Sequence, residues 1–160
     1  MWIVASNTSA QLDTSLVIGL AHTEAIRMGR AFQGGQYDTF IDLTHPEIVR
    51  WAGGREAMKA AMSKGLPDGD RLLDSRVDRS KKLFVSGDTV QCAMRERQEL
   101  LFEGKRYSTL GDVIGISYDA GMTWSFIGVA GRSLFEIRKQ FPEIHPGLDV
   151  WPQTPPMLIE

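Results

Sequence analysis

The spacing of the hydrophobic positions changes near residue 65 of the chain. Before that point, apolar side chains recur every three or four residues, and the clearest stripe consists of Val17, Ala21, Ala25, Met28 and Phe32. This spacing predicts a long helix that begins at Leu16 and ends at the glycine pair 34–35. A side-chain oxygen within residues 13–15 can cap its first turn, because it accepts an otherwise unpaired amide proton.

Shorter segments follow this helix, some before and some after residue 65. Residues 37–43 and 55–64 predict two short helices, and residues 47–51 between them are interpreted as a short strand. Strand-like stretches come next, joined by short turns rich in Gly and Asp, at residues 71–85, 89–102, 106–118 and 123–129. A last helix is expected at residues 133–141, whereas the proline-rich tail 151–160 predicts no regular element.

The order of these segments indicates the fold class. Helices followed by strands with hairpin-type connections are typical of an α+β domain, with the helices packed on one face of a mixed or antiparallel sheet. A chain of 160 residues suits one domain, which we expect at residues 1–150, followed by the tail at 151–160.

Composition and charge narrow the function classes. The formal net charge of −2 provides no global attraction for nucleic acid or anionic membranes, so neither is expected as a partner. The basic cluster Arg76, Arg79, Lys81 and Lys82 is interrupted by aspartates, and it is interpreted as a solvated strand or hairpin end. The only cysteine, Cys92, is expected to be a buried structural thiol. With no positive leader and no apolar run long enough to span a bilayer, we expect a soluble cytoplasmic protein.

Several sequence pieces resemble the nuclear-transport-factor-2-like superfamily, also called cystatin-like. They are AFQGGQYDTFIDLTHPEIV, GGREAM, VSGDTV and DAGMTWSF, in this order within residues 16–129. The likeness is to the polyketide-cyclase and steroid-isomerase branch. It implies a cone in which a strongly curved sheet wraps the long first helix and leaves a pocket at the open end. Members include isomerases, cyclases, dehydratases and transport adaptors, so the fold alone does not choose the function.

The resemblance can be compared with individual positions. An isomerase of this type needs a carboxylate base and a tyrosine, and these positions fall near Trp51 and Met28, neither of which can transfer a proton. Asp112 is the acidic candidate on a later strand, because alternation places it on the apolar face with Ile114. A carboxyl group buried there is a candidate general acid, because burial raises its pKa. The alternative is that the strand bends or frays at Asp112, so that its carboxylate faces solvent or an arginine such as Arg106.

Glu96 is the second catalytic candidate, and its role depends on the register of the hairpin between residues 102 and 106. With a three-residue loop, Glu96 faces Asp112, and two carboxyl groups that share one proton suit acid–base chemistry. With a two-residue Glu-Gly loop, the alternation shifts by one residue and the pair is lost. The sequence leaves both registers open.

Two function classes follow. The first is a pocket protein for a small apolar or aromatic ligand, with or without acid–base catalysis, whose pocket would be lined by Met28, Trp51, Met94, Ile114 and Tyr118. The second is a non-catalytic association module, and a homodimer is expected under either hypothesis because apolar residues occupy both faces of the strands. His45 is interpreted as an exposed turn residue. No histidine or carboxylate shows metal-ligand spacing, so no metal or other cofactor is expected.

Overall fold

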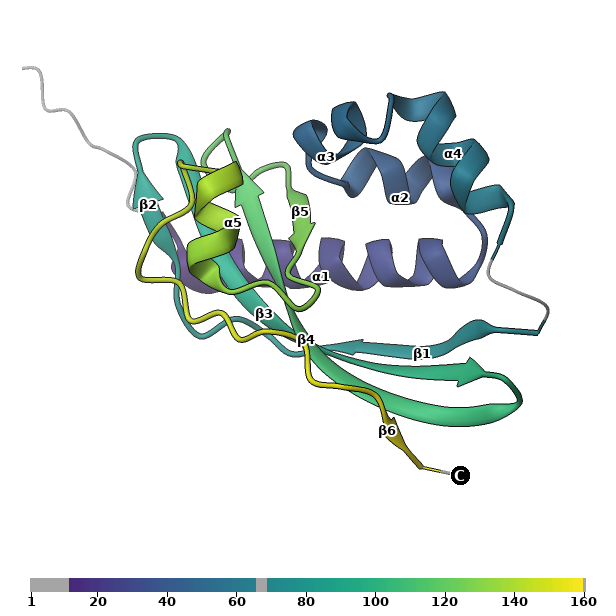
Figure 1. Ribbon diagram of the computed structural model, residues 1–160. Coiled ribbons are helices and arrows are strands. Elements are labelled where there is room, and N and C mark those ends of the chain that lie inside the picture. The colour runs from purple at the N-terminus through teal and green to yellow at the C-terminus, as the bar shows by residue number, and fades with distance from the viewer. Residues whose placement is uncertain (1–11, 66–68, 160) are drawn as a thin grey trace, which may run out of the picture.

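The structure is a computed structural model that describes residues 12–65 and 69–159. Its helices are α1 (Thr14–Gln33), α2 (Tyr37–Leu43), α3 (Pro46–Trp51), α4 (Arg55–Ser63) and α5 (Leu134–Gln140). Its strands are β1 (Arg71–Val77), β2 (Phe84–Ser86), β3 (Thr89–Phe102), β4 (Lys105–Ser117), β5 (Ser125–Gly128) and β6 (Met157–Leu158). Four helices therefore precede the described strands, and α5 follows β5 (Figure 1).

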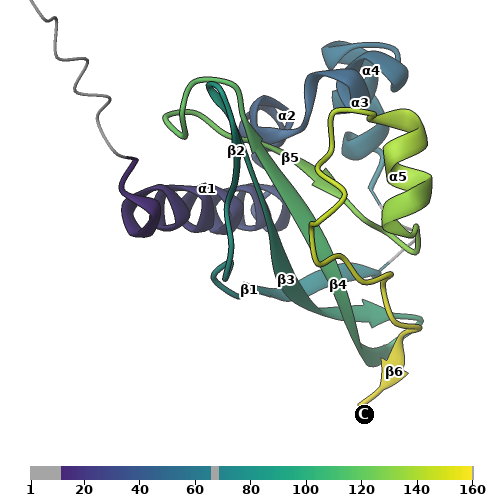
Figure 2. The same ribbon diagram turned by 90° about the vertical axis from the view of Figure 1, so that its left-hand side faces the viewer.

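Within the described residues the strands form one antiparallel sheet. Its main order is β1-β3-β4-β5, while β2 pairs with β3 and β6 pairs with β4. The sheet is neither closed nor strongly curled, and β1 and β5 lie at opposite ends of the strand order (Figure 2). The expected α+β class with an antiparallel sheet is confirmed. The cone that the resemblance implies, with a strongly curved sheet wrapped around the first helix, is not formed.

Both faces of the sheet are covered. Successive residues of β4 point to opposite sides, so Val113 packs beneath α1 while Ile114 and Ile116 pack beneath α5 (Figure 2). The cluster beneath α1 contains Val17, Ala21, Ala25, Leu43, Val90, Cys92, Met94, Val113, Trp124 and Phe126. These side chains fill the space between α1 and the sheet. The expectation that helices cover one face was incomplete, because α5 covers the other.

The long helix α1 forms as its sequence predicts. Asp13 Oδ1 accepts a hydrogen bond from the backbone N–H of Leu16 at 3.1 Å, which caps the first turn. The helix ends at Gly34, and Gly35 follows with φ +68°, a left-handed conformation that glycine tolerates. The predicted stripe is buried at its first three positions, whereas Phe32 near the end is 36% exposed.

Residues 46–51 form helix α3, so the prediction of a strand at 47–51 was wrong. Pro46 occupies the first turn, where its missing N–H costs nothing and its fixed φ suits a helix. His45 is the N-cap, and its Nδ1 accepts a hydrogen bond from Glu47 N at 3.3 Å. Glu47 and Arg50 then form an ion pair one turn apart. These local contacts stabilise a helix although the segment is short.

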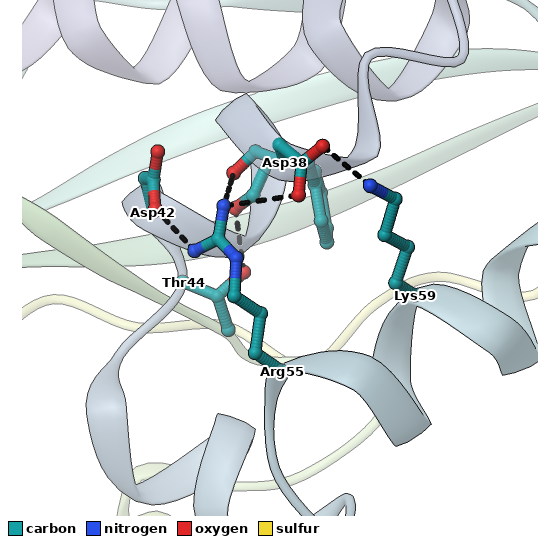
Figure 3. A network of polar contacts seen from close by, with 6 residues as sticks. Asp38, Asp42, Thr44, Arg55 and Lys59 are labelled. Atoms are coloured by element: carbon teal, nitrogen blue, oxygen red, sulfur yellow. Dashed lines mark hydrogen bonds and ion pairs between the residues drawn. The ribbon is translucent and has the colours of Figure 1, made fainter.

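An ionic network joins α4 to α2 (Figure 3). Arg55 at the start of α4 pairs with both Asp38 and Asp42 of α2, and Lys59 Nζ lies 2.6 Å from Asp38 Oδ2. Because Lys59 and then Arg55 hydrogen bond to it, the pKa of the Asp38 carboxyl lies below its ordinary value. All these side chains are about half exposed, so the network orients α4 on α2 more than it stabilises the fold.

The β3–β4 hairpin has the two-residue turn. Phe102 pairs with Lys105, and the turn residues Glu103 and Gly104 have φ +49° and +75°, as a type I′ turn requires. This register places Arg95 opposite Asp112 and Glu96 opposite Gly111. The carboxylate dyad of the three-residue alternative is therefore not formed.

The C-terminal tail runs along the free edge of β4. Thr154 N donates to Leu110 O at 2.7 Å, Ile159 N donates to Arg106 O at 2.9 Å, and β6 lies between them. The prediction of no regular element was wrong here, because residues 157–159 follow the last proline and have free amide groups that can pair with an open strand edge.

Candidate functional site

The predicted strand 71–85 is interrupted, and the interruption creates a cavity. β1 ends at Val77, which is opposite Glu96, and β2 starts at Phe84, which is opposite Gln91. Between these pairings the chain leaves the sheet, and the last contact is a hydrogen bond from Asp78 N to Arg95 O at 2.7 Å. We call residues 78–83 the crossover. Because the crossover lies outside the sheet, residues 93–95 of β3 have no β1 or β2 residue opposite them and border a cavity instead.

The cavity between the crossover, the β3–β4 hairpin and the tail has a volume of about 350 Å³. This lies at the lower end of the range for small-molecule sites. Residues 78–82 form one wall, residues 93–95 with Asp112 form the floor, and the other walls come from Phe84, Leu148, Asp149 and Trp151. The lining is mixed, with apolar side chains beside seven charged ones.

Asp112 is a buried carboxylate in this floor, and both of its oxygens have partners. Arg95 Nε donates to Asp112 Oδ1 at 2.9 Å, and the backbone N–H of Trp151 donates to Asp112 Oδ2 at 2.6 Å. The Asp112 side chain is 3% exposed, whereas that of Arg95 is 39% exposed. Asp112 is therefore a clamp that ties β4 to β3 and to the tail. The arginine beside it is Arg95, not the Arg106 that the sequence suggested.

Glu96 lies on the other face of the sheet. Its Oε1 accepts a hydrogen bond from Ser75 Oγ at 2.5 Å, on the side of α1 where Ser75 approaches Gly29. Asp112 lies on the opposite side, which α5 and the tail cover. The two candidate catalytic residues are thus separated by the sheet.

The charges of the cavity are arranged unevenly. The Asp112 hydrogen bond, and then the nearby carboxylates of Asp149 and Asp78, hold the pKa of Arg95 above its ordinary value. Three carboxylates therefore surround one guanidinium. On the crossover, Arg79 Nη2 donates to the Ser15 carbonyl oxygen at 2.5 Å, and the exposed Lys81 and Lys82 form no ion pair within the described part of the chain.

The five predicted pocket residues are not brought together. Met28 and Met94 pack beneath α1, whereas Ile114 is fully buried on the opposite face of the sheet. Trp51 is 50% exposed and its ring centroid lies 5.1 Å from that of Phe141. Of the five, Met94 also borders the observed cavity.

Tyr118, the fifth, is 52% exposed and contacts a buried histidine. Its hydroxyl oxygen lies 3.0 Å from Nε2 of His45, which is 3% exposed. Since His45 Nδ1 accepts a hydrogen bond from the backbone N–H of Glu47, we assign the ring proton to Nε2, which donates to the Tyr118 hydroxyl oxygen. Burial lowers the pKa of His45 and raises that of Tyr118. The interpretation of His45 as an exposed turn residue was wrong.

Comparison with known proteins does not identify a family for the chain. No family model, no curated protein and no solved structure matches it.

No group of three His, Cys, Asp or Glu side chains in residues 12–65 and 69–159 is placed to hold a metal ion. No helix in the same part of the chain is long and apolar enough to cross a membrane. Cys92 is buried between strands, and burial raises its pKa to about 12, so its thiol is a poor nucleophile.

The sequence interpretation missed the crossover as a site. It assigned residues 71–85 to one strand and regarded the basic cluster within it as a solvated end. The available signal was the run Asp78-Arg79-Ser80-Lys81-Lys82, which has no apolar residue at any position of a supposed strand. A run of five polar residues predicts a break in the sheet, and here that break forms the wall of the cavity.

Proposed function

We propose that the chain is a small-molecule-binding protein whose ligand occupies the cavity beside the crossover. The observation that carries the proposal is a cavity of about 350 Å³ that combines an apolar surface with polar groups held in place. Phe84, Leu148 and Trp151 offer the apolar surface for the body of the ligand. Arg95 and Asp112 are fixed by their mutual ion pair, so this floor is preorganised.

We further propose that the fold is a divergent form of the nuclear-transport-factor-2-like architecture. The order of the elements supports this, because a long capped helix and short helices precede a sheet built on a long hairpin. The ligand position differs from the one that the resemblance implies, since packed side chains fill the space beneath α1. Under this proposal the site has moved to the outer part of the sheet, where the tail completes it.

The proposal is for binding without acid–base catalysis by Asp112. A general acid or base must present a free oxygen or proton to its substrate. Both oxygens of Asp112 already accept hydrogen bonds, and Glu96 lies on the other face of the sheet. A cyclase, isomerase or dehydratase reaction through this pair would require the clamp to open.

An association module is the second candidate, and β6 is the observation that favours it. Met157 and Leu158 are 65% and 58% exposed, and β6 lies at the edge of the sheet with one side unpaired in the described structure. Such an edge can pair with a second copy of the same strand. If it does, a Met157→Lys, Leu158→Lys variant should be monomeric in light scattering while the parent chain is a dimer.

The binding proposal is tested by locating a bound probe. Amide chemical shifts are followed while 1-naphthol, a neutral aromatic probe, is added to the labelled full-length protein. We expect shifts at residues 78–84, 93–95 and 148–151. Trp151→Ala should weaken binding, whereas Trp51→Ala, which removes a similarly exposed tryptophan outside the cavity, should not. Shifts confined to other residues, or equal effects of the two variants, would overturn the proposal.

A further inference from the structure

We infer that the ligand of this cavity carries an anionic group, a carboxylate or a phosphate, that binds Lys81 and Lys82 of the crossover. The inference rests on the proposed function, because it assigns the chemistry of the ligand to the same cavity. It adds a direction to the site: the charged end of the ligand lies at Lys81 and Lys82, and its apolar body lies against Leu148 and Trp151.

The carboxylates that line the cavity lie near one cation of the fold, Arg95. Asp112, Asp149 and Asp78 all act on the one guanidinium of Arg95. Asp112 holds it by direct hydrogen bonds, so the buried carboxylate of the floor already has a cationic partner within the fold. A cationic ligand would have to compete with Arg95 for this carboxylate.

By contrast, the positive charge of Lys81 and Lys82 on the crossover is exposed to solvent. Neither lysine of the crossover forms an ion pair within the described residues, and both are exposed at the rim. Arg79 is anchored to a neutral partner, the backbone oxygen of Ser15, so its charge adds to the positive potential of the crossover. An anion at this rim gains attraction from adjacent cations without breaking an existing pair.

The backbone of the crossover supports the same orientation. Ser80 is buried, and its hydroxyl donates to Lys82 O at 3.0 Å and accepts from Lys82 N at 3.4 Å. This turn fixes the backbone at residues 80–82, while the side chains of Lys81 and Lys82 are exposed. Directly after the loop, the Phe84 ring stacks on His145 at a centroid distance of 4.1 Å, which holds this apolar side chain of the lining in place.

The expected size of the effect follows from the exposure of the lysines. An exposed ion pair changes an equilibrium by a few-fold at most, so two such pairs should give an anion a preference of about fivefold to tenfold. Because the lysines lie in solvent, this preference should shrink as the salt concentration rises.

The test uses three probes of one shape: 1-naphthoate, 1-naphthyl phosphate and the neutral 1-naphthamide. Each is titrated into the full-length protein at low salt and in 0.5 M salt, a concentration chosen for strong screening. We expect at least one anion to bind about fivefold more tightly than the amide at low salt and to lose most of this advantage at high salt. The ratio of naphthoate to naphthyl phosphate affinity then distinguishes a carboxylate ligand from a phosphate ligand.

The matched variants are Lys81→Gln with Lys82→Gln, and Lys64→Gln with Lys105→Gln. Both pairs remove two exposed positive charges, but the second pair lies outside the cavity. The first pair should abolish the preference for the anion, and the second should preserve it. If the amide binds as tightly as both anions, or if the first pair keeps the preference, the inference is overturned while the binding function stands. If none of the three probes shifts the amides of the cavity, the proposed function itself fails.

Discussion

The role of Asp112 as a clamp leads to a prediction that can be worked from the structure. The carboxylate holds three segments together: its own strand, Arg95 on β3 and the backbone of Trp151 in the tail. Asp112→Ala removes both contacts, whereas Asp112→Asn keeps the shape and one oxygen that can accept from the Trp151 amide. Comparing the two variants therefore separates the contribution of the Asp112 charge from that of its hydrogen bonds.

The magnitude depends on the environment of each partner. Removing one member of a buried ion pair costs about 3–5 kcal/mol, because the other charge is left without a partner. Here the Asp112 side chain is 3% exposed but that of Arg95 is 39% exposed, so the released guanidinium can regain water. We therefore expect Asp112→Ala to lower the free energy of unfolding by about 3 kcal/mol and Asp112→Asn by about 1–2 kcal/mol.

Urea unfolding measures this free energy, and amide hydrogen exchange at Trp151 measures the attachment of the tail. Exchange at Trp151 should become faster in Asp112→Ala and change less in Asp112→Asn. Asp74→Asn is the control, because it breaks the pair with Arg76, whose side chain is 78% exposed, and it should change stability by less than about 0.5 kcal/mol. Parental stability together with unchanged Trp151 exchange in Asp112→Ala would refute the clamp.

Three further predictions concern single positions. Burial lowers the pKa of His45, so neutral His45 stabilises the fold above its unfolded pKa of about 6.5, and this contribution is lost as the pH falls through the folded pKa. The free energy of unfolding measured with urea should therefore decrease below about pH 6.5. The decrease should be smaller in His45→Asn, which retains a capping oxygen. Gly121 has φ +89°, and Gly121→Ala would place a Cβ 2.5 Å from Val17 Cγ1, so it should lower the stability by at least about 2 kcal/mol. Gly131→Ala, where the new Cβ meets open space, should lower it by about 1 kcal/mol. Equal shifts in the thermal unfolding temperature of the two variants would disprove the close contact. Glu103→Asn creates the preferred type I′ turn and should raise stability by about 0.5–1 kcal/mol in urea unfolding; a loss would argue against the two-residue turn.

The helices show how far local sequence signals extend. The long helix, with its cap at Asp13 and its glycine end, and the short helix α2 follow from side chains within a few residues of one another. The same kind of signal also existed at α3, where His45 and Pro46 form an N-cap and a first turn. The prediction of a strand at residues 47–51 did not use this signal, although proline is favoured in the first turn of a helix.

The site could not be predicted from single segments, because it depends on how strands that are far apart in the sequence pair. Whether residues 71–85 continue as one strand is decided by how β3 is shared between β1 and β2, and the polar crossover avoids the sheet because it has no apolar face to bury. The tail is similar, since β6 exists because β4 has a free edge at Tyr107 and Ser108. The alternation of apolar and polar residues within one segment shows which residues share a face of the strand, but not which strand it pairs with.

The turn at Glu103 and Gly104 sets the register of the β3–β4 hairpin, which the sequence left open, and the register determines what the site contains. A type I′ turn requires a positive φ at both central residues, and glutamate adopts this conformation reluctantly, so local preference favoured neither register. The observed register is favoured by what it pairs: Arg95 meets Asp112, whereas a shift by one residue would have placed two carboxylates face to face. One residue of register therefore decides whether this hairpin presents an acid–base pair or a fixed, neutralised floor to the cavity, and the structure contains the second.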